Sequence, residues 1–286
     1  MSTTDVDAGD SHTYAVDDAR FEVVGGELKL KDGVSLDHDT EASVDVTVTT
    51  TDSGGATYTE TFSIAVGDVN EGPTDISLSN ASVAENAAGA VVGTLSTTDV
   101  DAGDSHTYAV DDARFEVVGG ELKLKDGVSL DHETESSVDV TVTTTDSGGA
   151  TFTETFSIAV GDVNEGPSDI SLSNASVAEN AAGAVVGTLS TSDVDAGDSH
   201  TYAVDDARFE VVGGELKLKD GVNLDHETEA SVDVTVTTTD SGGATYTETF
   251  SIAVGDVNEG PTDISLSNAS VAENAAGAVV GTLSTT

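Results

Sequence analysis

Acidic side chains in this chain occur in short runs and are not spread evenly. Between residues 74 and 167 they form five groups, Val83-Ala-Glu-Asn86, Asp99-Val-Asp101, Leu130-Asp-His-Glu133, Asp146 and Asp162-Val-Asn-Glu165. We expect all five at strand ends or turns, where the backbone presents carboxylates without disturbing a core. Calcium takes six to eight oxygen ligands from carboxylates, amides and carbonyls, and closely spaced Asp, Asn and Glu residues on loops suit it. Zinc or copper would require His or Cys ligands.

Two other interpretations of these acids remain open at this point. Asp and Asn also stabilise turns through hydrogen bonds to the backbone, with no metal involved. Glycosidases also use a pair of carboxylates, such as Asp131 and Glu133 could form, as their catalytic residues. The chain has no Trp to support a sugar ring, however, and the pair recurs in every repeat, which indicates a structural pattern. We therefore predict no enzyme activity and no catalytic residues.

Histidines accompany the acidic runs. His12, His106 and His200 follow the Asp-x-Asp runs, whereas His38, His132 and His226 each stand between two acids. Two histidines in each repeat are few for a transition-metal site. We expect exposed imidazoles whose neighbours are the metal ligands.

The composition limits the partners of the chain. Its 286 residues include 54 Asp and Glu against 9 Lys and Arg, a formal net charge of −45. This charge excludes nucleic acid, which requires a basic surface, and attraction to an anionic membrane surface. The absence of Cys excludes disulfides, a thiolate nucleophile and Cys-based metal sites. No apolar run is long enough to span a bilayer and no signal peptide is recognisable, so we expect no direct membrane insertion.

The sequence repeats with a period of 94 residues. The run Asp-Val-Asn-Glu-Gly-Pro occurs at 68–73, 162–167 and 256–261, and Asp-Val-Asp-Ala-Gly-Asp begins at Asp5, Asp99 and Asp193. Residues 2–95 and 96–189 differ at four positions, all mild: Asp39/Glu133, Ala42/Ser136, Tyr58/Phe152 and Thr74/Ser168. A repeat of this kind indicates an array of structural units.

Each period has the pattern of strands and turns. Val138, Val140 and Val142 alternate with polar residues, which is the period of a strand with one apolar face. A second alternating run follows the Asp146–Gly149 turn, and Gly119-Gly120 separates another pair of short strands. Because apolar alternation persists throughout, an acidic disordered tract is disfavoured. About seven strands in each period predict an all-β fold of tandem seven-stranded Greek-key β-sandwich modules, immunoglobulin-like in shape, in a linear array.

Proline sets the module boundaries. The three Pro residues each close an acidic linker, and Pro belongs in a linker or at the first residue of a strand. We therefore expect complete modules at 74–167 and 168–261, a module lacking its first two strands at 1–73, and those two strands alone at 262–286. Such a chain is expected to be a fragment of a longer array. Since 262–286 carry the strands missing from 1–73, strand addition from one chain to another is a further hypothesis.

Five motifs in a fixed order characterise each period, namely Val-Ala-Glu-Asn, Asp-x-Asp, Leu-Asp-x-Glu, Thr-Thr-Asp and Asp-x-Asn-Glu-x-Pro. In this order and in a module of this size they resemble cadherin repeats, and most closely the bacterial cadherin-like tandem repeats of large surface adhesins. The resemblance covers the whole chain. Each motif alone is weak, whereas five in order over three periods are strong together. The resemblance implies an extracellular, calcium-binding protein of the cell surface.

In that family calcium lies between consecutive modules, so the resemblance implies ligands at each linker. For 162–167 they are Glu85, Asp131, Glu133, Asp162, Asn164, Glu165, Asp193, Asp195 and Asp240. For 68–73 they are Asp37, Asp39, Asp68, Asn70, Glu71, Asp99, Asp101 and Asp146. For 256–261 they are Glu179, Asp225, Glu227, Asp256, Asn258 and Glu259, with no downstream module. Only the set at 162–167 is complete.

Two departures from the family pattern concern the calcium nearest the downstream module. The family linker is usually Asp-x-Asn-Asp-Asn-x-Pro, whereas this one is a residue shorter and has Glu165 where Asp is usual. Ser199 replaces the Asn of Asp-x-Asp-x-Gly-x-Asn. Two ions at each linker are therefore favoured over three.

Charge repulsion suggests how such a linker works. Two carboxylates ~5 Å apart repel by about 3 kcal/mol at an effective dielectric constant near 20. Several such pairs should make the linker flexible without metal and stiff with Ca²⁺, which extracellular modules bind at roughly 10⁻⁴–10⁻³ M. The leading hypothesis is a calcium-rigidified spacer in a cell-surface adhesin, with the neighbouring repeats as its partners. The alternative is that the modules themselves adhere, homophilically or to carbohydrate.

Overall fold

The computed structural model of the chain describes residues 2–6 and 9–285. Residues 1, 7 and 8 of the predicted first module, and residue 286 of the predicted last one, lie outside the described residues. The chain divides into two compact units, Met1–Val163 and Asn164–Thr286. The described part is built of strands and turns. It contains no helix long and apolar enough to cross a membrane.

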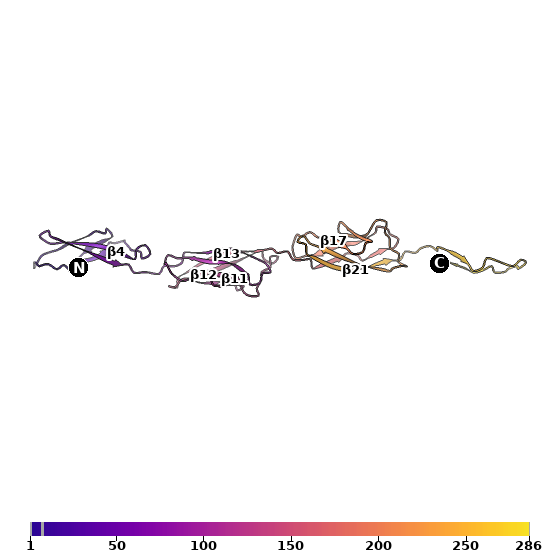
Figure 1. The fold of residues 1–286 in the computed structure, drawn as a ribbon, viewed down its shortest axis with the longest axis horizontal. Coiled ribbons are helices and arrows are strands. Elements are labelled where there is room, and N and C mark those ends of the chain that lie inside the picture. Colours follow the sequence, from indigo (N-terminus) through magenta and orange to yellow (C-terminus); the bar gives the residue numbers. More distant parts are fainter. Residues whose placement is uncertain (1, 7–8, 286) are drawn as a thin grey trace. The chain divides into compact units, whose positions relative to one another are not determined.

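In the first unit, residues 75–161 form a β-sandwich of two four-stranded sheets (Figure 1). The strand order is β10-β11-β8-β6 in one sheet and β7-β13-β12-β9 in the other. Their bounds are β6 (Asp75–Leu78), β7 (Ser82–Ala84), β8 (Val91–Thr98), β9 (Thr107–Val110), β10 (Phe115–Val118), β11 (Glu121–Leu124), β12 (Ser137–Thr145) and β13 (Thr151–Gly161). The prediction of β-sandwich modules is confirmed. The chain crosses between the sheets after Leu78, so β6 and β7 lie in different sheets and the sandwich has eight strands where about seven were predicted.

The crossing places the beginning of the sandwich beside its end. β7 pairs with β13 in parallel, with Ser82 opposite Ala159 and Ala84 opposite Gly161. The pairing continues one residue further, where the Glu85 backbone N–H donates to the Gly161 carbonyl at 2.9 Å. Glu85 therefore lies next to the segment that leaves the sandwich.

The core follows the period-two pattern of the strands. Val138, Val140 and Val142 on β12 are at most 5% exposed, and Leu122 and Leu124 face them from the other sheet at 0%. Their polar neighbours point outward because successive side chains of a strand alternate in direction. Each sheet thus buries one face against the other.

The second unit repeats this sandwich over residues 169–255. Its strands are β14 (Asp169–Leu172), β15 (Ser176–Ala178), β16 (Val185–Ser192), β17 (Thr201–Val204), β18 (Phe209–Val212), β19 (Glu215–Leu218), β20 (Ser231–Thr239) and β21 (Thr245–Gly255). The register of each ladder matches its counterpart 94 positions earlier, including the parallel pair β15–β21. The same sequence therefore gives the same fold twice.

The two ends of the chain carry parts of the same fold. Near the N-terminus, β1 (Thr13–Val16), β4 (Ser43–Thr51) and β5 (Thr57–Ala65) form one sheet, and β2 (Phe21–Val24) and β3 (Glu27–Leu30) form another. Near the C-terminus, β22 (Ile264–Leu266) pairs with β23 (Leu283–Thr285). The predicted module boundaries at Pro73, Pro167 and Pro261 stay predictions.

Candidate metal centre

Glu85 is the most buried acid at the C-terminal end of the first sandwich. It is 2% exposed. Its Oε2 accepts a hydrogen bond from the His132 backbone N–H and its Oε1 accepts one from Val163, each at 2.7 Å. These two bonds, first that of His132, lower the pKa of Glu85, so the side chain is an anion at neutral pH. One carboxylate oxygen each of Glu85, Asp131 and Glu133 lie within 4.8 Å of one another.

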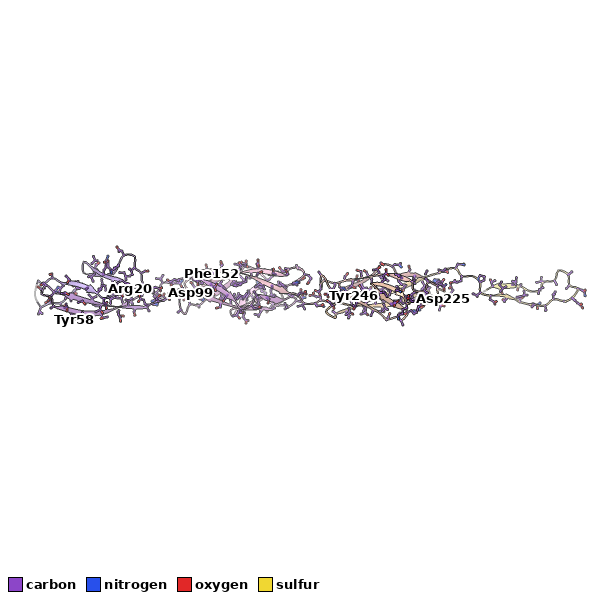
Figure 2. All side chains as sticks on the ribbon, turned by 90° about the horizontal axis from the view of Figure 1, so that it is seen from above. Arg20, Tyr58, Asp99, Phe152, Asp225 and Tyr246 are labelled. Carbon is purple, nitrogen blue, oxygen red and sulfur yellow. The ribbon has the colours of Figure 1, made fainter. Side chains whose placement is uncertain are left out.

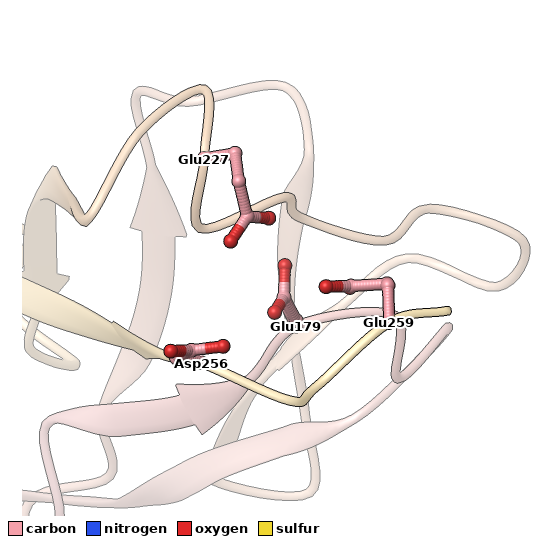
Figure 3. A group of neighbouring side chains, drawn as sticks. All are labelled: Glu179, Glu227, Asp256 and Glu259. Carbon is pink, nitrogen blue, oxygen red and sulfur yellow. The ribbon is translucent and has the colours of Figure 1, made fainter. Parts of the chain in front are cut away.

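The second unit gathers four acids at the equivalent place (Figure 3). Oxygens of Glu179, Glu227, Asp256 and Glu259 lie within 4.8 Å of one another. Glu179 is 2% exposed and accepts from the Val257 and His226 backbone N–H groups at 2.7 Å. A backbone hydrogen bond within Glu227 lowers its pKa, but burial and the neighbouring carboxylates outweigh it, and the pKa is raised. The four carboxylates therefore repel one another when all are ionised.

Within the first unit, the linker at 68–73 brings together acids from three segments. Asp39 precedes β4, Asp68 belongs to the linker and Asp101 follows β8, and their carboxylates lie within 4.8 Å of one another. Asp101 Oδ2 accepts from the Glu71 backbone N–H at 2.8 Å, whereas Asp101 Oδ1 is buried with no hydrogen-bond partner. Burial raises the pKa of Asp39 and of Glu71, and the Asp101 carboxylate raises both further. This cluster resists full ionisation.

A second cluster beside this linker contains Asp99, Asp104 and Asp146. Asp146 is 6% exposed and accepts from the Asn70 side-chain amide at 3.0 Å. Asp104 Oδ1 accepts from the Ser147 hydroxyl at 2.7 Å, and its Oδ2 is buried without a hydrogen-bond partner. A Cβ at position 148 would overlap the side-chain amide of Asn70, so the linker lies directly against glycine backbone.

The same contacts recur in the second unit. The Asn164 amide donates to Asp240 at 3.1 Å, and the Glu165 backbone N–H donates to Asp195 at 2.8 Å. Asp195 Oδ1 and Asp198 Oδ2 are buried and unpartnered, as are their counterparts in the first unit. A hydrogen bond from His200 holds Asp193, in the way that His106 holds Asp99. The arrangement is a property of the repeat.

Most of the predicted ligands enter these clusters or contact them. The pKa of His132 is raised, first by its hydrogen bond to the Val160 carbonyl and further by the nearby Asp162 carboxylate. Asp37 and Asp225 are engaged in turns, where they accept from the backbone N–H groups of Thr40 and Thr228 at 3.3 and 3.2 Å. The side-chain amides of Asn70, Asn164 and Asn258 each donate to the carbonyl of the next residue. Those of Asn70 and Asn164 also donate to an aspartate of a sandwich. The assignment of all of these residues as ligands remains a prediction.

The sequence analysis missed Asp104 and Asp198. Each is the last acid of the run Asp-Val-Asp-Ala-Gly-Asp, and the repetition of an acid at this place in all three periods is the signal that could have identified it. The residues stand one position before Ser105 and Ser199, where the family pattern has Asn. Each therefore adds a carboxylate to the region where that departure had suggested a weaker site.

The expectation of exposed histidines is wrong. The side chains of His106 and His200 are 14% and 15% exposed, because each imidazole Nε2 is hydrogen-bonded to Asp99 or Asp193 at 2.9 or 2.8 Å. His132 and His226 are half-buried, and their Nδ1 atoms are hydrogen-bonded to the Val160 and Val254 carbonyls at 2.7 Å. These imidazoles fix the loops that carry the acids.

The donor chemistry of the clusters fits calcium. Their candidate ligands are carboxylate and amide oxygens, which a hard cation prefers. Buried oxygens without a donor, such as Asp101 Oδ1 and Asp104 Oδ2, are costly unless a cation or water satisfies them. Burial and then the Asp101 charge raise the pKa values of Asp39 and Glu71, and a divalent ion would offset both effects. The residues present therefore fit Ca²⁺.

Comparison with known proteins concerns the fold. No family model matches the sequence. Among solved structures, PcdhgB3 EC1-4 has a TM-score of 0.65 at 23% identity, over 86% of this chain and 67% of that chain. The extracellular domain of protocadherin GammaB4 has a TM-score of 0.71 at 22% identity, over 96% and 48%. Mouse cadherin-23 EC22-24 has a TM-score of 0.64 at 21% identity, over 86% of each chain.

The chain spans between 48% and 67% of the length of these two protocadherins. All three structures consist of cadherin extracellular domains, and the two sandwiches described above share their architecture. The two sandwiches therefore have the fold of cadherin extracellular domains.

Proposed function

We propose that the chain is a calcium-binding extracellular segment that Ca²⁺ makes rigid, acting as a spacer in a cell-surface adhesin. The observation that carries the proposal is the cluster of Asp39, Asp68 and Asp101 within 4.8 Å. These residues come from one sandwich, the linker and the next sandwich. An ion held by all three restricts the motion of each sandwich relative to the other.

The chain's own residues prepare this site. The backbone N–H of Glu71 orients Asp101, and the Asn70 amide holds Asp146. When bound, Ca²⁺ supplies the positive charge that allows all of these carboxylates to be ionised together. Without it, their repulsion favours separation of the segments that carry them. The linkers at 162–167 and 256–261 carry the same residue types and are assigned the same role.

The role of spacer is supported by the near-identity of the repeats. Each copied module adds the same length to the array, so repetition serves a spacer directly. A surface that recognises one specific partner would not need to be repeated in every module. The order of the motifs resembles that of bacterial surface adhesins, and we assign the chain to that context. Nothing in the clusters suggests a reaction, so the proposed function is mechanical.

A calcium titration tests the proposal. We expect Ca²⁺ to increase the radius of gyration in small-angle scattering and to raise the melting temperature, with half-saturation at roughly 10⁻⁴–10⁻³ M. A chelator should reverse both changes. Asp101→Asn should weaken the response, whereas Asp45→Asn, at an exposed position on β4, should leave it unchanged.

A radius of gyration and a melting temperature that do not change when Ca²⁺ is added would refute the proposal. The alternative, that the modules themselves adhere, predicts calcium-dependent aggregation of beads coated with the chain or binding to immobilised glycans. Both should be absent if the chain is only a spacer.

A further inference from the structure

Arginine is scarce in this chain, and it always occupies the same place in the repeat. Arg20, Arg114 and Arg208 are the only arginines among 9 basic residues, against 54 acidic ones. Arg114 precedes β10, and Figure 2 labels Arg20, its counterpart before β2. Each arginine forms ion pairs with an Asp two positions earlier and with a Glu 21 positions later. This pair of contacts is therefore a property of the repeat.

The guanidinium of Arg114 is held in a fixed orientation. Its Nη2 donates to Asp112 Oδ2 at 2.8 Å, and its Nε lies 3.2 Å from both oxygens of that carboxylate. The Arg114 backbone N–H donates to Asp112 Oδ1 at 2.8 Å, and the next residue, Phe115, is 1% exposed in the core. These contacts engage one edge of the guanidinium and leave Nη1 to donate to Glu135.

Glu135 closes the turn that carries two of the clustered acids, Asp131 and Glu133. The backbone N–H of Glu135 donates to the Asp131 carbonyl at 3.0 Å. Within the same turn, another backbone N–H donates to Glu85 at 2.7 Å. The turn is therefore attached to Glu85 by its backbone and, through the side chain of Glu135, to Arg114.

Repulsion makes the attachment to Arg114 important. Carboxylate oxygens of Glu85, Asp131 and Glu133 lie within 4.8 Å of one another, and their charges favour movement of the turn away from Glu85. Glu135 would add a further negative charge two residues from Glu133, but its charge-assisted hydrogen bond to Arg114 compensates it. Because the guanidinium is a rigid planar fork, it also orients the carboxylate that it binds.

We propose that the arginine of each repeat is a positioning residue of the candidate calcium site. Arg114 holds the turn of Asp131 and Glu133 in the arrangement that a cation requires, and it acts through Glu135 without touching the ion. Arg20 and Arg208 have the same role for their own turns, where Glu41 and Glu229 likewise donate a backbone N–H to an Asp carbonyl at 3.0 Å. The inference rests on the proposed function, since it concerns the same acidic clusters.

The exposure of the ion pair indicates where its effect should appear. The side chains of Arg114 and Glu135 are 36% and 30% exposed, and ion pairs near the surface add little to folding stability. The loss of such a pair should therefore change the melting temperature of the metal-free chain only slightly. The affinity for Ca²⁺ should change much more, because it depends on the position of the ligands.

Isothermal titration of the intact chain with CaCl₂ tests the proposal. Two variants are compared, one with Arg20→Met, Arg114→Met and Arg208→Met, and a control with Lys29→Met, Lys123→Met and Lys217→Met. Both sets remove three positive charges, but the lysines pair with acids that are not predicted ligands. We expect the arginine variant to bind Ca²⁺ about 10-fold more weakly or worse, and the lysine variant to bind within about twofold of the unaltered chain.

The melting temperature in the presence of a chelator separates positioning from folding. A lower melting temperature with unchanged calcium affinity would show that the arginines are purely structural and would overturn the proposal. Equal weakening of calcium binding in the arginine and lysine variants would also overturn it, because charge alone would then explain the effect. An unaltered chain that binds no Ca²⁺ would refute the proposed function itself. An unaltered chain that binds Ca²⁺ with an affinity equal to that of the arginine variant would refute only this inference.

A double-mutant cycle tests the path through the glutamates. Glu41→Ala, Glu135→Ala and Glu229→Ala, introduced together, break the same link from the other side. Added to the arginine substitutions, they should weaken calcium binding no further than the arginine substitutions alone. Fully additive losses would show that the arginines do not act through these glutamates and would overturn the proposal.

Discussion

The N-terminal sheets and the first complete sandwich have nearly the same sequence and differ in burial. Leu122 and Leu124 on β11 are inaccessible to solvent, whereas Leu28 and Leu30 on β3 are half-buried. The strands form in both places, with the same hairpin register. The difference shows that alternation within a strand determines which face is apolar, whereas the strands of the opposite half determine whether that face is buried.

The largest expected effect concerns this core. Leu122→Ala should destabilise the complete sandwich by about 2–5 kcal/mol, because it leaves a cavity among fully buried side chains. Leu28→Ala removes the same atoms from a half-buried site and should cost clearly less. Hydrogen exchange of the backbone amides in β12 and β4, measured in both variants, checks the two effects separately. Equal losses of protection would mean that residues 1–73 have a covered core in solution.

An intermediate effect concerns the contact of the linker with the sandwich that follows. Gly148→Ala should displace Asn70, which lies against the backbone at position 148, and should weaken calcium binding by about 10-fold or more. Gly54→Ala is the matched control, since its Cβ would lie 3.4 Å from Asp52 Oδ1, an ordinary contact. Isothermal titration with CaCl₂ measures both affinities. An unchanged affinity for Gly148→Ala would exclude Asn70 from the site.

The smallest expected effect is on the pH dependence of stability without metal. Hydrogen bonds from His132 and Val163 lower the pKa of Glu85, so its contribution is present above the unfolded pKa and is lost as pH falls through the folded pKa. Burial and Asp101 raise the pKa of Glu71, so its ionisation opposes the native arrangement, and stability increases as pH falls through its folded pKa.

Melting curves recorded in the presence of a chelator test these two opposite effects on stability. Glu85→Gln should lower the melting temperature at neutral pH, and Glu71→Gln should raise it. Shifts of the same sign in both variants would contradict this assignment of the two carboxylates.

Local patterns were sufficient to predict the β-sandwich and much of the candidate site. Alternation identified Val138, Val140 and Val142 as core residues. The acidic runs predicted Asp68 and Asp101 as metal ligands, and the structure brings their carboxylates together, although their role as ligands remains a prediction. The role of Glu85 depends on the parallel pairing of β7 with β13, which joins residues far apart in sequence. Asp104 and the partial burial of the imidazoles were missed because their positions depend on how the loops fold back.

The parallel pairing of β7 with β13 also determines how a sandwich carries tension. A load applied to the two ends of such a module pulls β7 and β13 in opposite directions along their common axis. Their hydrogen bonds, and those that tie Glu85 to Gly161 and Val163, are then loaded in shear and must break together. The same bonds in an antiparallel end pair would open one at a time, at lower force.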